Sequence, residues 1–568
     1  MRRQFNYAML ALAFIGQFAA GCASARVSAK AKKPADQTAA TAPPEAAPLS
    51  PEALDLRVEA LTHYSLGVAY ELRDEPERAL ASFTKSALAD PGNEPLVLDV
   101  ARRLIRRKEP EAAVKALELL GKAAAYPGSS GAVDALLGVA HAQAGRTEEA
   151  IDASRAAIVK APRLMQGYQN LVQLYLQANR AEEALKLLDQ AAKTPAPSAQ
   201  FLIDLSDLYA TYIKLRIHEL DAVKPKLLAV LSEAAKLQPA APGLVQRMAE
   251  NYRLVGEFKQ AADLYLALLK RFPEQPSFRD RLIDLYLRGN DRKAAAEQLE
   301  SVIRDNPTNP QANYFLGAIA HEEKNLDKAA EAFEKAIRFG PDLEPAYYEL
   351  AGVRLSQDKA PQAVAVLEKA RALFKVNFVL EFYSGLAQSR LKNYAKAAAH
   401  FTSAELLAKR DEPERLTHVF YFQVGATQER NKNFAEAEKY FEQCLRLSPD
   451  FADALNFLGY MWAERGMNLS RAREMIEKAV KQEPDNAAFL DSLGWVFFKL
   501  GQPKEALPWL LKSIQHTKEP DATLHDHLGD VYLALKQIKE AREEWRKSLA
   551  IEPNAEIQKK LDAALAPR

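Results

Sequence analysis

Two short stretches of this sequence carry residue types that do chemistry elsewhere. Ser82 and Lys85 fit the spacing S-x-x-K, in which a lysine can activate a serine nucleophile. His525 and His527 flank an aspartate, and all three are side chains that ligate metal ions. These are the strongest candidates for a nucleophile and for a metal site, so their context decides whether the protein is an enzyme.

Both stretches lie on segments with helical periodicity, and this context argues against chemistry. Phe83 stands at a core position, which places Ser82 and Lys85 on a packed helix. Metal-binding histidines on a helix are spaced i and i+4, whereas residues two apart point to different sides. We expect His525 to pack and His527 to face solvent. The sequence therefore predicts a protein that is not an enzyme and has no metal site and no cofactor.

The charge balance and the cysteine count exclude two further classes. The 568 residues include 76 basic and 75 acidic ones, a formal net charge of +1, so there is no broad basic field to bind nucleic acid. The two cysteines, Cys22 and Cys444, stand in very different contexts, and a disulfide scaffold is excluded for a chain this long. Cys444 occupies a small core position, where a buried and unreactive thiol is expected. Stability must come from packing.

The N-terminus has the organisation of an export signal. Arg2 and Arg3 precede an apolar run over residues 7–20, which is too short to span a bilayer and ends in small residues. The stretch AAGC at residues 19–22 resembles the lipobox of bacterial lipoproteins, although alanine stands where leucine is commonest. The resemblance implies that residues 1–21 are a signal peptide and that Cys22 receives acyl chains such as palmitate.

The alternative to acylation is ordinary cleavage near Ala23 or Ala25, which would discard Cys22. If Cys22 is acylated, the alanine after it favours the outer membrane facing the periplasm, because the family's inner-membrane retention residue, aspartate, is absent there. Residues 22–50 are rich in alanine and proline and cannot bury enough surface to fold, so they predict a tether with a reach of roughly 30 Å.

The rest of the chain repeats one pattern of small and aromatic residues. Counting from Gly317, small residues follow at +12 (Ala329) and +19 (Ala336), an aromatic at +16 (Phe333) and a proline at +24 (Pro341). Most steps between anchors are 34 residues. The anchors are Gly67, Ala101, Gly138, Val172, Ser206, Ala249, Ile283, Gly317, Ala351, Gly385, Gly425, Gly459, Gly494 and Gly529.

Each offset has a physical reason in a pair of antiparallel helices. Small residues at 0, +12 and +19 let the helices approach closely, and proline at +24 cannot continue the second helix. The apolar stripe of one pair can be buried only when the next pair stacks on it.

This pattern resembles the tetratricopeptide repeat (TPR). The resemblance implies an all-α fold, an α-solenoid superhelix of about fourteen helix pairs over residues 51–553 with a capping helix at 554–568, whose groove is lined by the first helix of each pair. The period breaks at 206–249 and 385–425, which indicates either longer helices or a protruding turn on the one hand, or a joint between superhelical segments on the other.

Polar residues on the groove face are the candidate partner-binding site. In the TPR family, positions −6, −3, +1, +4 and +5 often hold ligands, and in the unit anchored at Val172 these positions include Gln166, Gln169, Gln173 and Gln177. Amides both donate and accept, so this stripe could hydrogen-bond an extended backbone. A solvated polar face is the alternative.

Aromatic residues at −3 in four successive units are the second candidate. They are Tyr314, Tyr348, Phe382 and Phe422. They could form a ladder for the apolar side chains of a bound segment, or they could pack within their own units. Towards the C-terminus the same face carries Asp491, Asp526 and Asp530, which would favour a basic or amino-terminal partner segment.

Together these features predict a membrane-tethered scaffold or adaptor of the bacterial cell envelope, which binds an envelope protein or an extended segment in its groove. Residues 454–510 are similar to units of long TPR lipoproteins, one of which delivers substrates to a periplasmic carboxyl-terminal processing protease. The alternatives are a scaffold for exopolysaccharide export or envelope assembly, a glycan or peptidoglycan binder, and a cytoplasmic co-chaperone if the signal is not used.

Overall fold

The fold is built from helices alone over the part of the chain that the structure describes. The computed structural model describes residues 50–107 and 109–565, which form 29 α-helices and two short 3-10 helices and contain no strand. This confirms the predicted all-α solenoid. None of the described helices is both long and apolar enough to cross a bilayer.

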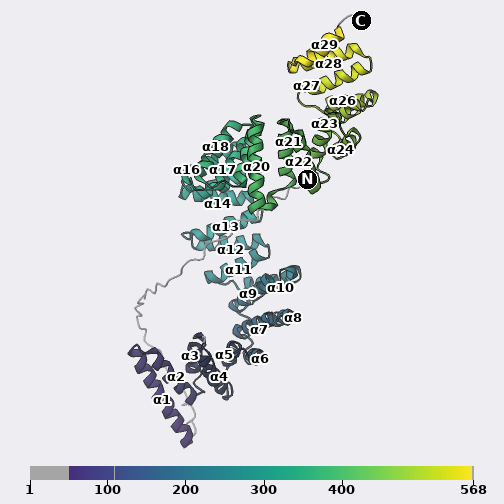
Figure 1. The fold of residues 1–568 in the computed structure, drawn as a ribbon. Helices are drawn as coiled ribbons and strands as arrows, with labels where there is room; N and C mark the ends of the chain where they lie inside the picture. The colour runs from purple at the N-terminus through teal and green to yellow at the C-terminus, as the bar shows by residue number, and fades with distance from the viewer. Residues whose placement is uncertain (1–49, 108, 566–568) are drawn as a thin grey trace. The chain divides into compact units, whose positions relative to one another are not determined.

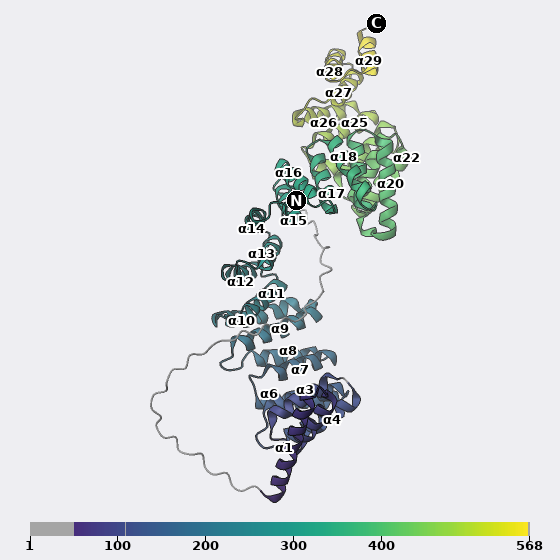
Figure 2. The same ribbon diagram turned by 90° about the vertical axis from the view of Figure 1, so that its left-hand side faces the viewer.

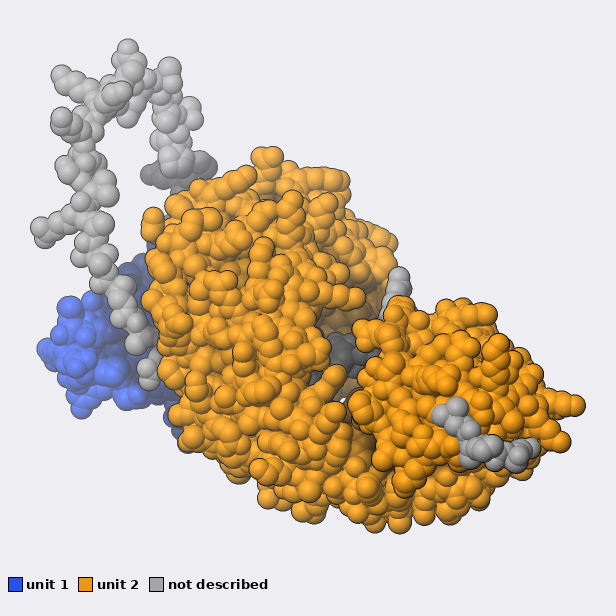
Figure 3. All heavy atoms as spheres, turned by 90° about the horizontal axis from the view of Figure 1, so that it is seen from above, with its two compact units in different colours: residues 1–161 blue, residues 162–568 orange. Residues whose placement is uncertain are grey.

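The chain divides after Ala161 into two compact units, coloured separately in Figure 3. Unit 1 contains α1 (Pro51–Leu72), α2 (Pro76–Ala89), α3 (Glu94–Arg106), α4 (Pro110–Ala124), α5 (Gly131–Gln143) and α6 (Thr147–Lys160). The first part of unit 2 contains α7 (Met165–Gln177), α8 (Ala181–Ala191), α9 (Ala199–Leu215), η1 (Ile217–Glu219), α10 (Leu220–Lys236), α11 (Pro242–Leu254), α12 (Phe258–Arg271), α13 (Pro276–Arg288), α14 (Arg292–Asp305), α15 (Pro310–Glu322) and α16 (Leu326–Phe339).

The second part of unit 2 continues the same succession to the C-terminus. It contains α17 (Glu344–Ser356), α18 (Ala360–Leu373), α19 (Phe378–Arg390), α20 (Tyr394–Asp411), η2 (Pro413–Arg415), α21 (His418–Arg430), α22 (Phe434–Leu447), α23 (Ala452–Glu464), α24 (Leu469–Gln482), α25 (Ala487–Lys499), α26 (Pro503–His516), α27 (Ala522–Ala534), α28 (Ile538–Ile551) and α29 (Ala555–Leu565). Figures 1 and 2 show successive helices such as α7 to α10 side by side in both views.

The helices pair as the sequence period predicts. Every anchor residue lies on an odd-numbered helix from α1 to α27, and each of these helices packs on the helix that follows it. The anchor glycine faces the +16 residue, since a Cβ added to Gly317 would lie 2.8 Å from the ring of Phe333, and one added to Gly385 would lie 2.7 Å from Phe401. At these glycine anchors the close approach of the two helices therefore requires a small residue, as expected.

The turn inside a pair is made by a residue in the left-handed region. Among the residues that the structure describes, twelve pairs have a positive φ at the seventh residue after the anchor, for example 62° at Lys324. This conformation ends the first helix and reverses the chain within a few residues. The twelve residues are Asp74, Gly145, Asn179, Gly256, Asn290, Lys324, Asp358, Lys392, Lys432, Gly466, Gly501 and Lys536.

The two breaks in the period are longer helices. The pair at 206–249 has 17 residues in each of α9 and α10, joined by η1, whereas α7 has 13 and α8 has 11. The pair at 385–425 has an 18-residue α20 followed by η2. Longer helices, the first of the two alternatives, are therefore what the structure contains at both places.

The last helix covers the end of unit 2. Ile557 and Leu561 of α29 pack on Trp545 of α28, whose indole is fully buried. Lys560 of α29 bonds to Asp526 and Asp530 of α27. An amphipathic helix thus shields the apolar surface that the final pair would otherwise expose.

Candidate functional site

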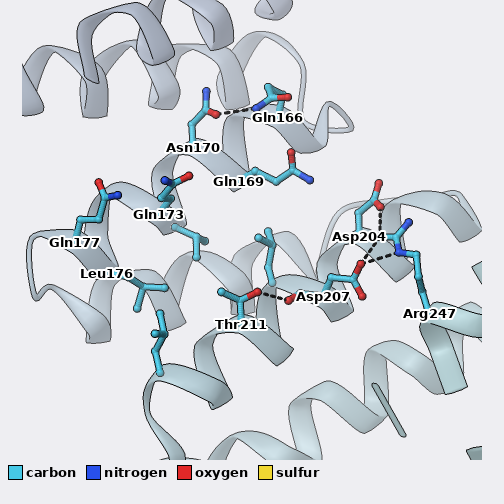
Figure 4. A pocket seen from close by; sticks show the side chains of 13 residues that line it. Gln166, Gln169, Asn170, Gln173, Leu176, Gln177, Asp204, Asp207, Thr211 and Arg247 are labelled. Carbon is cyan, nitrogen blue, oxygen red and sulfur yellow. Dashed lines mark hydrogen bonds and ion pairs between the residues drawn. The ribbon is translucent and has the colours of Figure 1, made fainter. Parts of the chain in front are cut away.

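Three consecutive first helices, α7, α9 and α11, form an open cavity of about 730 Å³ (Figure 4). The residues that line it come from all three helices. They are Gln166, Gln169, Asn170, Val172, Gln173, Leu176 and Gln177 of α7, Asp204, Asp207, Leu208, Thr211 and Leu215 of α9, and Arg247 of α11. All thirteen belong to unit 2, so the cavity lies within one compact body.

The α7 side of the cavity carries the predicted amide stripe. Gln166, Gln169, Gln173 and Gln177 all line the cavity, so the structure brings these four predicted residues together. Gln166 Nε2 donates to Asn170 Oδ1 at 2.8 Å. Gln173 and Gln177 are exposed. Their amides are therefore open to solvent and accessible to a ligand, to which each can both donate and accept a hydrogen bond.

The opposite side carries an ion-pair network that connects α9 to α11. Arg247 donates from Nε to Asp207 at 2.7 Å and from a terminal nitrogen to Asp204 at 2.5 Å. Asn251 Nδ2 donates to Asp207 at 2.6 Å and to the buried Ser206 hydroxyl at 2.9 Å. Burial by itself lowers the pKa of Arg247, but its hydrogen bonds to Asp204 and Asp207 outweigh this and raise the pKa. The guanidinium therefore stays charged and fixes both carboxylates in place.

Sequence reasoning missed this charged side. Asp207 and Thr211 stand at +1 and +5 from the anchor Ser206, the same offsets that pointed to Gln173 and Gln177, so applying the rule to the next unit would have found them. Asp204 and Arg247 stand at −2 from their anchors, outside the offsets used. The Asp–Arg pairing carried no sequence signal, because it joins residues 40 and 43 positions apart.

The cavity offers hydrogen bonds rather than a reaction. Amides, a hydroxyl and carboxylates already paired with arginine line it, together with Val172, Leu176, Leu208 and Leu215. Such a lining can hydrogen-bond an extended backbone and hold small apolar side chains between the polar groups.

The four aromatic residues at −3 are not brought together in this cavity. Phe382 lies 5.9 Å from Phe401 and 6.0 Å from Phe420, and Phe422 lies 5.2 Å from Phe457, measured between ring centroids. Tyr314 lies 5.7 Å from Phe333. Tyr348 is only 8% exposed, and its hydroxyl donates to Glu344 at 2.6 Å. The rings thus pack against other side chains of their own and neighbouring helix pairs, as in the second of the two interpretations given above. Their role in partner binding stays a prediction.

The acidic residues near the C-terminus are already paired. Asp526 and Asp530 both accept from Lys560, and Asp491 accepts from His527 Nδ1 at 2.9 Å. The prediction that these carboxylates await a basic partner segment is therefore not supported, because α27 and α29 supply the cations.

The expectation that His527 faces solvent is wrong. Its side chain is 4% exposed and its ring stacks on Trp495 with centroids 3.8 Å apart. Burial lowers its pKa, but Asp491, with smaller contributions from Glu464 and Asp526, outweighs burial and raises it. His525 instead bonds to Glu544 at 2.6 Å, so the two histidines use different partners, and the described residues contain no cluster of three potential metal ligands.

The remaining predicted positions lie in the core or outside the described residues. Cys444 is fully buried on α22, and burial raises the pKa of its thiol to about 12, in agreement with an unreactive core cysteine. Phe83 packs against Gly67, as a core aromatic should. The predicted lipidation site Cys22, with the signal peptide and tether, lies outside the described residues.

Three solved structures are among those similar to this chain. A tetratricopeptide repeat protein from Parabacteroides merdae has 17% identity and a TM-score of 0.36 and covers 47% of this chain and 99% of its own. The APC/C hetero-tetramer Cut9–Hcn1 has 16% identity and a TM-score of 0.31, with 91% and 97% covered. YrrB, described as a TPR protein with an unusual peptide-binding site, has 23% identity and a TM-score of 0.29, with 34% and 97% covered.

The family comparison places repeats along unit 2. No curated protein matches the sequence. Two tetratricopeptide repeat models match, one over residues 281–344 and 468–523 and the other over 419–451 and 522–555. Each matched segment contains helix pairs with the anchor spacing described above. Over these segments the chain is similar to tetratricopeptide repeats, which act as scaffolds for protein interaction.

Proposed function

We propose that this protein is an interaction scaffold or adaptor of the bacterial cell envelope, which binds an extended segment of another envelope protein in the cavity between α7, α9 and α11. The observation that carries the proposal is the amide stripe of α7 facing the fixed carboxylates of α9 across one open cavity of about 730 Å³. An extended peptide presents alternating N–H and C=O groups along its length, and glutamine side chains can satisfy both kinds.

The arrangement favours a peptide over a small charged ligand. Arg247 is already paired with Asp204 and Asp207, so its positive charge is offset by two carboxylates on this side of the cavity. The two carboxylates and the arginine leave a formal charge of −1 in the network, which suits a neutral or mildly basic segment. The leucines at 176, 208 and 215 would contact the side chains that alternate with the backbone groups.

A library of displayed peptides, screened against the full-length protein, tests the cavity. We expect recovered peptides to bind wild type at least about tenfold more tightly than a Gln169→Ala/Gln173→Ala variant, which corresponds to a loss of about 1.4 kcal/mol. Gln362→Ala is the matched control, because this exposed glutamine lies on α18, a second helix away from the cavity. Peptides that bind the double variant as well as wild type would place the site elsewhere.

The tether is the second part of the proposal, and it rests on the lipobox resemblance at residues 19–22. Acylated Cys22 would hold the helix pairs near the periplasmic face of the outer membrane. Cells fed radiolabelled palmitate should label wild type but not a Cys22→Ala variant. A mature N-terminus at residue 23 or beyond, without label, would instead favour ordinary cleavage and a released protein.

Delivery of substrates to a periplasmic carboxyl-terminal processing protease is the finer form of this role, supported by the similarity of residues 454–510. A protease adaptor shortens the lifetime of the protein that it delivers, whereas a scaffold for polysaccharide export or envelope assembly does not. If this protein is such an adaptor, the proteins captured by a photo-cross-linker placed at Gln173 should persist longer in cells that lack it. Unchanged lifetimes would favour the assembly scaffold.

A glycan ligand is the competing outcome for the same cavity, because amides and carboxylates also hydrogen-bond sugar hydroxyls. Titrating the full-length protein with purified peptidoglycan fragments separates the two. Saturable binding that is lost in the Gln169→Ala/Gln173→Ala variant, together with no selected peptide, would replace the peptide proposal by a glycan one.

A further inference from the structure

The first helix, α1, presents a stripe of apolar side chains that no described residue covers. Its other side packs on α2, where Ala60 and Gly67 are buried and Tyr64 lies 5.6 Å from the ring of Phe83. The stripe consists of Leu54 (54% exposed), Val58 (57%), Leu61 (61%), Val68 (37%) and Leu72 (85%). Exposed apolar patches of this kind usually mark an interface.

The spacing of the stripe is that of a two-stranded coiled coil. Six of the exposed positions of α1, at residues 54, 58, 61, 65, 68 and 72, follow one another along this stripe at intervals of 4, 3, 4, 3 and 4, which are successive d and a positions of a heptad. Ser65 at the fourth position is also exposed. A single helix needs no such register to pack on α2, so the pattern points to a second helix on the exposed side.

The spacing of the stripe is the same when the direction of the helix is reversed. Reversed, the intervals are again 4, 3, 4, 3 and 4, and an antiparallel copy would place Leu54 opposite Leu72, Val58 opposite Val68 and Leu61 opposite Ser65. A surface that matches itself on reversal suits an antiparallel two-fold dimer, because every contact between two residues is then repeated with the two copies exchanged.

The charges beside the stripe fit the same antiparallel pairing. Arg57 and Glu71 both occupy g positions. The antiparallel arrangement places Arg57 of each copy opposite Glu71 of the other, so the dimer would contain two such ion pairs. Arg57 has no ion pair with a described residue, whereas Glu71 bonds to Arg103 and keeps its side chain 44% exposed. In a parallel pair, Arg57 would not face Glu71. Tyr64 would meet its own counterpart near the two-fold axis.

We propose that α1 is the interface through which two copies of this protein associate, with their α1 helices antiparallel. A membrane surface is the other occupant that an amphipathic helix could have, but the sequence of α1 disfavours it. This helix carries Glu52, Asp55, Glu59 and Glu71 against a single Arg57, and anionic headgroups repel such a helix. A second copy instead provides the opposite charge for each Arg57.

Sedimentation of the full-length protein at micromolar concentration is the first test. We expect a dimer for wild type and a monomer for Leu61→Glu, with the dissociation constant raised at least about tenfold, because a carboxylate would enter the apolar seam twice. Val159→Glu is the matched control, since this valine is 79% exposed on α6 and should leave the dimer intact. A monomeric wild type, or a dimer that survives Leu61→Glu, would overturn the proposal.

Cross-linking tests the direction of the two helices. In a Cys22→Ser background, in which the buried Cys444 is the native cysteine that remains, Leu54→Cys and Leu72→Cys proteins should form disulfides when mixed and not separately. Residues 54 and 72 are about 27 Å apart along α1, so a parallel dimer would cross-link each variant with itself and none of the mixed pair. That second pattern would contradict the antiparallel interface.

A charge exchange tests the ion pairs and also separates a copy from a membrane. Arg57→Glu should weaken the dimer, and adding Glu71→Arg should restore much of it, since the opposite charges face each other again. If neither variant alters association, but Leu61→Glu reduces binding to vesicles that contain phosphatidylglycerol, the membrane would be the occupant and the dimer proposal would fail.

Discussion

At the scale of the residue, the glycine at an anchor and the ring sixteen residues later pack as one unit. A Cβ on Gly317 would lie 2.8 Å from Phe333, closer than real Cβ contacts, and the equivalent distance is 2.8 Å for Gly425 and Phe441. The ring cannot withdraw freely, because Phe333 is fully buried against the next pair. The glycine thus sets the distance between the two helices.

This contact predicts opposite effects of the same substitution at two helical glycines. Gly317→Ala should destabilise α15 and α16 by up to about 2 kcal/mol, since overpacking costs about 1–3 kcal/mol and the gain in helix propensity offsets only about 1 kcal/mol of it. Gly121→Ala on α4 should stabilise by up to about 1 kcal/mol, since its Cβ would meet nothing within 4 Å. Hydrogen exchange of the local amides measures both, and equal stabilisation would show that Phe333 yields.

His527 predicts a pH dependence confined to the C-terminal pairs. Its pKa is raised in the fold by Asp491 against the lowering effect of burial. The stabilisation is therefore complete below the unfolded pKa of about 6.5 and is lost as pH rises through the raised folded value. Hydrogen exchange in α25 and α27 should become faster relative to α15 as the pH rises above about 6.5. A His527→Phe variant should keep the stacking on Trp495 and lose this difference, whereas an unchanged difference would assign it to another group.

The same residues show what a sequence can reveal and what it cannot. The pairing of Gly317 with Phe333 was predictable because both lie within one 34-residue period. The glutamine side of the cavity was predictable because one helix carries all of it. The exposure of His527 was predicted wrongly, because its cover comes from Trp495 on the preceding first helix, and the periodicity of α27 alone contains no information about that neighbour.

At the scale of the element, the turn within a pair depends on one left-handed residue. Glycine adopts that conformation freely, but Lys324, Lys392, Lys432 and Lys536 occupy it with φ between 61° and 65°. A lysine in this region costs roughly 1 kcal/mol compared with glycine. These four pairs therefore carry avoidable strain in their turns.

Replacing one of these lysines by glycine should stabilise its pair. We expect Lys324→Gly to raise the stability of α15 and α16 by about 0.5–1 kcal/mol, as read from local hydrogen exchange. Lys335→Gly is the control, since this exposed lysine lies inside α16 and its replacement should cost about 1 kcal/mol of helix propensity. A loss of stability in Lys324→Gly would mean that the lysine side chain contributes more than the backbone strain costs.

At the scale of the whole molecule, the chain is a succession of helix pairs, and helices contact mainly their partner in the pair and the neighbouring pair. The chain divides into two compact units after Ala161. In such an array stability is approximately a sum over pairs and their interfaces, so damage to one pair should remain local. The residues of the proposed binding cavity lie in unit 2, whereas the proposed dimer helix lies in unit 1. Binding and association are thus assigned to different units.

Separating the units should therefore separate the two activities. A fragment of residues 50–161 should fold and self-associate through α1, and one of residues 162–568 should fold as a monomer and keep the peptide site. Their helical circular dichroism, weighted by length, should sum to that of residues 50–568, since the cut falls in the loop between α6 and α7. If the larger fragment dimerised instead, the dimer interface would belong to unit 2. If either fragment lost its helices, the two units would have to fold together, and the independence inferred from their internal contacts would be wrong.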